Sequence, residues 1–331
     1  MSESLTLLTE TAERLFSDLA ARRGEPFEAL WPEIEAAGFP ALMIAETDGG
    51  FGGDWRDAFA VARLAGAHAV ALPITEAIVA GAFGACGGGL TVTAPGCEGG
   101  FEAGRFTGSL SGVPFGRHAT ALLAVCNGLV LRLPTNTAAQ TIHALNPAGE
   151  PRDRFRFEAA EVEILAAGLD GVGPFELGAL MRAGQIAGAL DAALVQSIDY
   201  VNQRVQFGKP LAKFQAMQQA LAQFAEEAAA VNCAGQAAAA AADRGQAELE
   251  IAAAKLRANM AAGVGGAIAH QAHGAIGFTE ESGLHVLTRR LIAWRSEFGA
   301  DRFWAERLGG AVAAIGADHL WAELTRRTDT P

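Results

Sequence analysis

The chain has 331 residues, half of them hydrophobic, and a formal net charge of −12 at pH 7. This length allows one large core or two to three subdomains. With a pI near 5.1 the chain has no basic face to displace counterions from phosphates, which argues against a nucleic-acid partner. Glycine and charged residues interrupt every apolar run before it reaches the length of a membrane span, so no membrane segment is predicted.

Targeting and redox signals in the sequence indicate a cytoplasmic protein. The first 15 residues include acidic side chains and alternate polar with apolar positions, which is not the pattern of a signal peptide. The cysteines Cys86, Cys97, Cys126 and Cys233 are scattered without the spacing of a metal site. We therefore predict a reduced cytoplasmic setting and no metal centre.

Helical periodicity dominates the first quarter of the chain. Residues 5–85 place apolar side chains at helical spacing, with one turn-rich loop at residues 45–53 and a further helix from Trp55 to Ala69. The sequence predicts an N-terminal helical domain over residues 1–86.

The pattern changes at about Gly87, where short runs of alternating polarity begin. Clusters of Gly and Pro separate these runs, which cover residues 90–93, 106–110, 121–125 and 129–131. Such a pattern is typical of antiparallel strands, and it ends near Leu165. We predict a small antiparallel β domain over residues 87–167.

Long alanine-rich segments make up the rest of the chain. After a linker at residues 168–173, helices are predicted at 175–204, 211–244, 247–272 and from 284 to about 321. Alanine runs such as Ala237–Ala242 have high helix propensity and favour close helix packing. These segments predict a C-terminal four-helix bundle over residues 168–331. The predicted fold class is mainly α with a middle β domain.

The turn between the first two of these helices contains residues suited to a phosphate-bearing ligand. Gly208 and Pro210 end one helix and begin the next. Arg204 falls at the end of the first helix, where a cation suits the helix dipole and can bind phosphate. Nearby rings and amides add stacking faces and hydrogen bonds: Phe207, Phe214, Gln206 and Gln215. The turn either binds a nucleotide diphosphate or is an ordinary helix–loop–helix connection with a surface arginine.

A second stretch downstream relates this turn to a known family. It reads Gln271-Ala272-His273-Gly274-Ala275-Ile276-Gly277-Phe278-Thr279-Glu280. Together with the first turn it resembles the C-terminal half of acyl-CoA dehydrogenases, specifically over residues 170–310 and more faintly upstream. In that family an Arg-x-x-Phe-Gly-Lys-Pro…Phe-Gln turn and a Gln-x-x-Gly-Gly-x-Gly-Phe turn come from neighbouring subunits and close around one FAD.

The resemblance implies a set of cofactor-binding residues in this chain. They are Arg204, Gln206, Phe207, Leu211, Phe214, Gln215, Gln271, His273 and Gly274. For His273 two roles are open, a contact with adenine and the capping of a turn. The resemblance thus implies FAD as the cofactor, and an acyl-CoA thioester as the substrate.

The sequence also departs from the family in the β domain. The loop Val92-Thr93-Ala94-Pro95-Gly96-Cys97 stands where the family has a flavin-contacting Thr-Glu-Pro-x-(Ala/Gly)-Gly-Ser-Asp loop. Residues 108–115 have no clear counterpart of the family's second flavin-contacting segment. Ala275 replaces a glycine of the second turn, which adds a methyl group near the ADP end of the cofactor. The predicted β domain is therefore an abbreviated one.

Neither position of the family's catalytic base is occupied by a carboxylate. The base takes the α-proton of the thioester while FAD takes a hydride from the β-carbon. The family's Glu-Gly-Thr motif aligns with Phe298-Gly299-Ala300, and its alternative position aligns with Gly178. We predict the neighbour Glu297 as the catalytic residue, although adjacent helical residues point about 100° apart. The alternatives are Glu176 as the base, a chain without a base, and for Glu297 the role of a solvated or ion-paired helix acid near Arg295.

These features, together with the resemblance, predict an FAD-dependent acyl-CoA dehydrogenase that is one subunit of a heteromeric α2β2-type complex in steroid or related catabolism. Its partners would be a second acyl-CoA dehydrogenase-like chain and an electron-transfer flavoprotein as acceptor. Two alternatives are a self-sufficient homo-oligomeric enzyme and a catalytically silent assembly subunit of the same fold. The sequence does not identify the acyl group.

Overall fold

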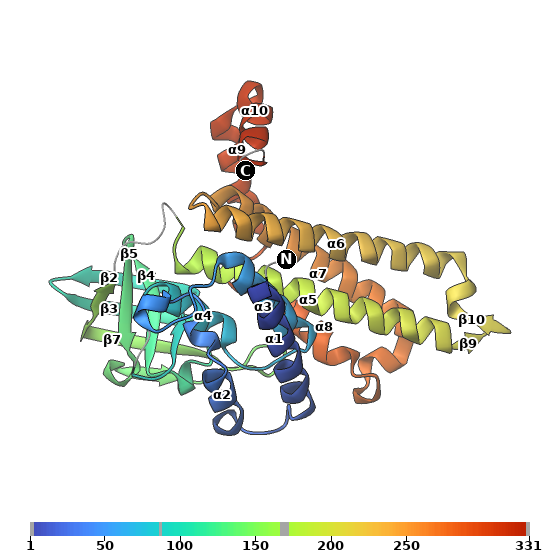
Figure 1. Ribbon diagram of the computed structural model, residues 1–331, viewed down its shortest axis with the longest axis horizontal. Coiled ribbons are helices and arrows are strands. Elements are labelled where there is room, and N and C mark those ends of the chain that lie inside the picture. The colour runs from blue at the N-terminus through green and yellow to red at the C-terminus, as the bar shows by residue number, and fades with distance from the viewer. Residues whose placement is uncertain (1–2, 86–87, 166–171, 329–331) are drawn as a thin grey trace.

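The computed structural model describes residues 3–85, 88–165 and 172–328. Figure 1 shows a β domain at one end, a long helical bundle that extends to the other end, and the N-terminal helices between them. Within these described ranges, no helix is both long and apolar enough to cross a membrane. In the same residues, no group of three potential ligands is placed to hold a metal ion.

Four helices form the N-terminal part. They are α1 (Glu3–Ala21), α2 (Phe27–Ala36), α3 (Trp55–Ala67) and α4 (Ile74–Ala82). Helix α3 begins with a capping box, in which Asp54 Oδ1 accepts from the Asp57 amide at 2.8 Å and Asp57 Oδ2 accepts from the Asp54 amide at 3.3 Å. The helix predicted from Trp55 is therefore confirmed, and it begins at Trp55 because two acidic side chains satisfy its first free amides.

Two four-stranded sheets form the β domain in the described residues. The first has the order β1-β4-β5-β8 and consists of β1 (Thr91–Thr93), β4 (Ala121–Cys126), β5 (Leu129–Pro134) and β8 (Glu163–Leu165). The second has the order β2-β3-β7-β6 and consists of β2 (Gly96–Glu102), β3 (Arg105–Pro114), β7 (Arg152–Glu161) and β6 (Gln140–Ile142). The prediction of a small antiparallel domain is confirmed, with one exception: β1 pairs with β4 in parallel.

The bundle consists of α5 (Pro174–Gln203), α6 (Gln215–Asp243), α7 (Glu248–His273) and α8 (Leu284–Ser296). Pro174 occupies the first turn of α5, where its missing amide costs no hydrogen bond. Glu176 reaches back and accepts from the Gly173 amide at 3.0 Å. A short hairpin, β9 (Val205–Gln206) with β10 (Lys209–Pro210), separates α5 from α6 at the far tip of the bundle.

The single helix predicted from residue 284 to about 321 is wrong. Helix α8 ends at Ser296, and α9 (Asp301–Ile315) and α10 (Ala317–Thr328) follow it and project from the bundle (Figure 1). Phe298 and Gly299 have φ of 52° and 98°, which no α-helix contains. The Trp304 indole donates to the Phe298 carbonyl at 2.9 Å and holds this break in place. Gly316, with φ of 79°, ends α9.

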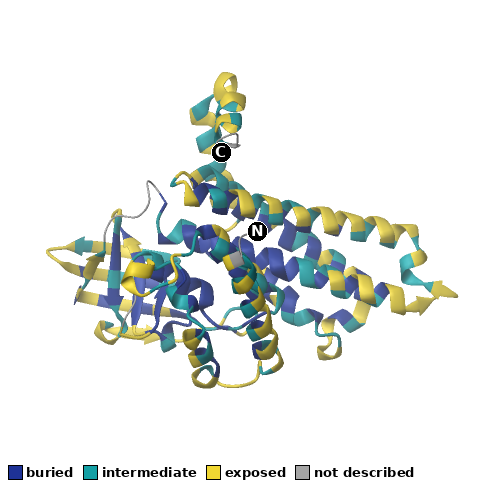
Figure 2. Ribbon diagram, in the orientation of Figure 1, coloured by how far each residue is buried: buried dark blue, intermediate teal, exposed yellow. Residues whose placement is uncertain are grey.

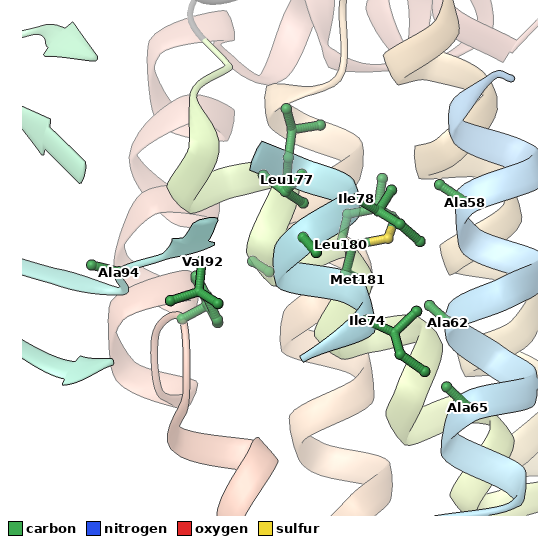
Figure 3. Close-up of a cluster of buried hydrophobic side chains, with 14 of the residues drawn as sticks. Ala58, Ala62, Ala65, Ile74, Ile78, Val92, Ala94, Leu177, Leu180 and Met181 are labelled. Atoms are coloured by element: carbon green, nitrogen blue, oxygen red, sulfur yellow. The ribbon is translucent and has the colours of Figure 1, made fainter. Parts of the chain in front are cut away.

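One hydrophobic core joins the N-terminal helices, the β domain and the bundle. Figure 3 shows Ile78 of α4, Met181 of α5, Ala62 of α3 and Val92 of β1 as members of this core. The backbones of α3 and α5 touch, because a Cβ built on Gly188 would lie 1.8 Å from the Arg63 carbonyl oxygen. The predicted domain boundaries, 86/87 and 167/168, lie outside the described residues.

Candidate functional site

A pocket of about 310 Å³ lies where the β domain meets the end of α8. Its lining combines the β1–β2 loop, β3, the segment before β7 and the α8–α9 turn: Pro95, Gly96, Ser111, Gly112, Asn146, Pro147, Arg152, Ala293, Ser296, Glu297, Phe298 and Gly299. The structure therefore brings the loop Val92–Cys97 close to the segment with the predicted catalytic residue, although nearly 200 residues separate them in sequence. We call this cavity the junction pocket.

Phe298 occupies one of the two positions at which the resemblance places a catalytic base, and its ring covers the other, Gly178. Its ring is buried, with 2% exposed, and a Cβ built on Gly178 would lie 2.3 Å from its Cε1 atom. Gly178 and Phe298 are therefore in direct contact, and the ring fills the space between α5 and the α8–α9 turn. The Arg182 guanidinium lies 5.6 Å from the ring centroid, a cation–π contact that adds to this packing.

Replacing Gly178 with alanine is expected to lower the free energy of unfolding by about 1–3 kcal/mol, because the new methyl overlaps the Phe298 ring. Urea unfolding followed by circular dichroism measures this loss. The double variant Gly178→Ala/Phe298→Leu should lose less than the sum of the two single variants, since the smaller side chain leaves room for the methyl. Strict additivity would contradict the packing of Phe298 on Gly178.

Glu297 is buried in a network of ion pairs. Its carboxylate accepts from Arg152 Nε at 2.7 Å and from Arg152 Nη2 at 2.9 Å, a bidentate pair. The second oxygen also lies 2.9 Å from Arg182 Nη2, and Asn146 Nδ2 donates to the first at 3.0 Å. Arg182 in turn pairs with Glu76 of α4 at 2.6 Å. The predicted pairing of Glu297 with Arg295 does not occur; Arg295 pairs with Asp301 instead.

This network sets the charge state of Glu297. Burial alone would raise the pKa of this carboxyl, but Arg152 and Arg182 outweigh burial and lower the pKa to about 2. A general base works best with a pKa near the operating pH, and a carboxylate this acidic is a weak proton acceptor. Glu297 as the catalytic base stays a prediction, and its ion pairs favour a structural role.

The network continues toward the start of α8. Arg152 Nη2 pairs with Glu150 at 2.9 Å, and Glu150 lies 2.9 Å from Arg290 Nε. The Trp294 indole donates to Glu150 at 3.3 Å. The network thus ties β7 to α8 through side chains that sequence reasoning missed.

Glu176, the second carboxylate considered for the base, lies elsewhere. It occupies the first turn of α5, where it pairs with Arg307 of α9 at 2.6 Å as well as capping the helix. It does not line the junction pocket. Its contacts account for its position without a catalytic role.

Lys255 of α7 is fully buried beneath the α8–α9 turn. Its ammonium donates to Asn259 Oδ1 at 2.5 Å, and to the carbonyls of Trp294 at 3.2 Å and Gly299 at 3.3 Å. Burial, together with the positive charge of Arg182, lowers the pKa of Lys255 to about 7. Lys255 therefore holds the turn that carries Phe298 through neutral acceptors alone.

The stability of the wild type relative to a Lys255→Met variant is expected to rise by roughly 1.4 kcal/mol per pH unit between pH 7 and pH 10. In this window the unfolded state binds a proton at Lys255 that the folded state does not, so folding becomes more favourable as the pH rises. Urea unfolding at pH 7, 8 and 9 measures the difference. The matched control is Lys213→Met, an exposed lysine, which should show no such slope. Parallel pH profiles for wild type and Lys255→Met would contradict the lowered pKa.

The predicted cofactor-binding turn lies at the tip of the bundle, where exposed residues gather (Figure 2). Arg204 ends α5 and is exposed, as are Gln206 and Gln215. Phe207 has 87% of its surface exposed and a φ of 54°, and its ring lies 6.1 Å from that of Phe214. Leu211 is partly buried. Its amide donates to the Arg204 carbonyl at 2.9 Å.

The second predicted turn lies at the same end of the bundle. The His273 ring stacks on Tyr200 of α5 with centroids 4.5 Å apart, and its Nδ1 lies 2.9 Å from the Ala269 carbonyl oxygen. Gly274 follows with φ of 64° and ψ of −144°, a conformation that favours glycine. Gln271 is exposed beside them. Because His273 is buried against Tyr200, it reinforces the end of α7, and a contact with adenine stays a prediction.

The structure separates the tip of the bundle from the junction pocket. Between Gly178 and Arg204, α5 rises about 1.5 Å per residue, which places the two about 40 Å apart. This distance exceeds the length of an extended FAD. The tip therefore presents guanidinium, amide and aromatic groups about 40 Å from the junction pocket, which Phe298 lines.

Comparisons with known proteins show what this chain is similar to. Residues 172–309 match the model of the acyl-CoA dehydrogenase C-terminal domain. The chain is also 29% identical over 278 residues to the acyl-CoA dehydrogenase IpdE2 of Mycobacterium tuberculosis, which covers 82% of each chain. The resemblance to acyl-CoA dehydrogenases predicted from the sequence is thus confirmed, and residues 172–309 match the family's C-terminal domain.

Solved structures show that the acyl-CoA dehydrogenase fold extends over the whole chain. The ChsE4-ChsE5 complex of M. tuberculosis matches with a TM-score of 0.85 at 19% identity, over 96% of this chain and 99% of that one. The Tcur3481-Tcur3483 steroid acyl-CoA dehydrogenase matches with a TM-score of 0.83 at 21% identity, over 95% and 99%. Butyryl-CoA dehydrogenase of Megasphaera elsdenii matches with a TM-score of 0.78 at 18% identity, over 94% and 98%. The family predicted from the two turns is confirmed.

Proposed function

We propose that this chain is a subunit of a heteromeric FAD-dependent acyl-CoA dehydrogenase, and that the base for α,β-dehydrogenation comes from a second chain. One observation carries the proposal: the Phe298 ring is packed on Gly178, at the two positions where the family places its base. The nearest carboxylate, Glu297, is held ionised between two arginines.

Two of the similar solved structures support this proposal. The two solved structures reported above with the highest TM-scores are each named for two chains, ChsE4-ChsE5 and Tcur3481-Tcur3483, and the second is a steroid acyl-CoA dehydrogenase. We propose an acyl-CoA ester of a steroid or related compound as the substrate of the complex. An electron-transfer flavoprotein is the proposed acceptor, and a structure described by that name also matches this fold.

In the complex, the exposed tip of this bundle would hold the ADP end of a flavin whose ring lies against the second chain. Arg204 would pair with the diphosphate, Gln206 and Gln215 would donate their amide hydrogens, and Phe207 would offer a stacking face. When bound, FAD would supply the hydride acceptor for the reaction. The contribution of this chain is to bind and orient that cofactor, since its own base positions are closed.

The self-sufficient enzyme remains an alternative only if Phe298 moves away from Gly178 and Glu297 exchanges its arginine partners for substrate. A silent assembly subunit would keep the fold and the interface but not the flavin contacts. Activity of the complex after changes at the bundle tip separates this last alternative from the proposal.

Affinity purification of the tagged chain from its own organism tests the proposed function. We expect a second acyl-CoA dehydrogenase-like chain to copurify, one with a Glu-Gly-Thr base motif, an intact Thr-Glu-Pro loop and bound flavin. The tagged chain purified by itself with full acyl-CoA turnover would overturn the proposal.

A further inference from the structure

A second pocket, of about 400 Å³, lies on another side of the buried ion-pair network. It is formed by the α1–α2 connection, residues 69–72, the turn η3 (Gly116–His118), residues 148–151 and the first turns of α8. It shares no lining residue with the junction pocket. We call it the α8 pocket, and the proposed function assigns it no role.

The α8 pocket has an apolar floor. Aliphatic and aromatic side chains from the N-terminal helices and the β domain form it: Leu19, Phe27, Leu30, Val70, Leu72 and Phe115. The rings of Phe27 and Phe115 lie 6.1 Å apart, and His118 stacks on Phe27 with centroids 4.0 Å apart. Such a floor suits the apolar body of a small molecule, which burial removes from water.

Two arginines at this pocket have no carboxylate partner among the described residues. Arg23 Nη2 donates to the His68 carbonyl at 2.9 Å, and Arg289 Nε donates to the Pro147 carbonyl at 2.7 Å. Arg290, the third arginine of the lining, is already paired with Glu150. Burial lowers the pKa of Arg23, and the neighbouring positive charge of Arg290 lowers it further.

His285 adds an independent sign of a missing partner. It lines the α8 pocket, and its Nδ1 atom is buried with no hydrogen-bond partner in the described part of the chain. Buried polar atoms in native structures are nearly always paired, so an orphan beside a cavity points to a group that enters it. The lining contains three arginines and two glutamates, which leaves one net positive charge when both histidines are neutral.

We propose that the α8 pocket binds a small amphipathic carboxylate, with its apolar body on the floor and its carboxylate paired with Arg23 and Arg289. A planar carboxylate matches the planar guanidinium fork, and a single negative charge matches the single excess positive charge. The site lies between all three parts of the fold, so its occupant stabilises their arrangement.

Isothermal titration calorimetry of the full chain with 4-phenylbutyrate tests this site, with the neutral amide 4-phenylbutanamide as the matched ligand. We expect the acid to bind at least tenfold more tightly than the amide. The variants Arg23→Gln and Arg289→Gln should each weaken acid binding roughly tenfold or more, since each loses a charge-assisted pair. Arg23 and Arg289 are both exposed, so both variants should fold.

The matched control is Arg302→Gln, which changes an arginine of α9 whose side chain is 89% accessible and pairs with Glu306. It should bind the acid as the wild type does. The proposal would be overturned if the acid did not bind, or if the acid and the amide bound with equal affinity. It would also be overturned if Arg302→Gln lost as much affinity for the acid as Arg23→Gln and Arg289→Gln. The assay contains no flavin and no second chain, so its failure leaves the proposed function as it stands.

Discussion

Replacing Glu297 with glutamine is expected to lower the free energy of unfolding by about 3–5 kcal/mol. The carboxylate neutralises Arg152 and Arg182 in a buried network, and its loss leaves two guanidinium groups short of a partner. Urea unfolding at pH 7 measures the effect, with Glu280→Gln, an exposed glutamate, as the matched control. A loss below 1 kcal/mol would show that the network does not depend on Glu297.

The acid dependence of stability offers a second test of the same pair. The pKa of Glu297 lies at about 2 in the folded chain and near 4.5 in the unfolded chain. Its contribution is therefore fully present above pH 4.5 and is lost as the pH falls from 4.5 toward 2. In Glu297→Gln this part of the acid-induced loss should be absent.

The same variant separates the two roles considered for Glu297. If the base comes from the second chain, the folded complex with Glu297→Gln should retain its acyl-CoA turnover to within tenfold. If Glu297 is the base, turnover should fall by a factor of about 10²–10⁴, the usual contribution of a general base.

Replacing Arg204 with glutamine is expected to weaken FAD binding by the complex by about ten- to a hundredfold. A charge-assisted pair between a guanidinium and a phosphate contributes about 1.5–3 kcal/mol. Arg204 is exposed at the tip of the bundle, so the stability of the chain itself should change little. Flavin release followed by fluorescence measures the dissociation constant.

Arg14→Gln, an exposed arginine on α1, is the matched control for this experiment. If both variants bind FAD equally well, the tip does not contact the cofactor, and the silent assembly subunit becomes the better account. If Arg204→Gln weakens FAD binding while the second chain still copurifies, the tip contacts the flavin and is not needed for the interface.

Local patterns in the sequence predicted much of this fold. The alanine-rich periodicity predicted α5, α6 and α7 within a few residues of their ends, and the alternating runs predicted β1, β3, β4 and β5. The break at Phe298 was missed because a phenylalanine with positive φ has no local signal. It depends on tertiary contacts from Trp304 and Lys255.

The buried ion-pair network was also beyond sequence reasoning, because its members come from α4, β7, α5 and α8. One signal was present: Arg182 interrupts the otherwise apolar and small-residue start of α5, where an unpaired cation could not be buried. A search for the carboxylates that must pair with it would have led to Glu76 and Glu297.

The visible absorption spectrum of the purified chain, expressed without any partner, tests the central claim most directly. Because the flavin-contacting loop of the β domain is abbreviated and Phe298 occupies a base position, we expect a folded, colourless protein that gains flavin only when the second chain is added. A flavin band near one per chain, reduced on addition of an acyl-CoA, would contradict this account.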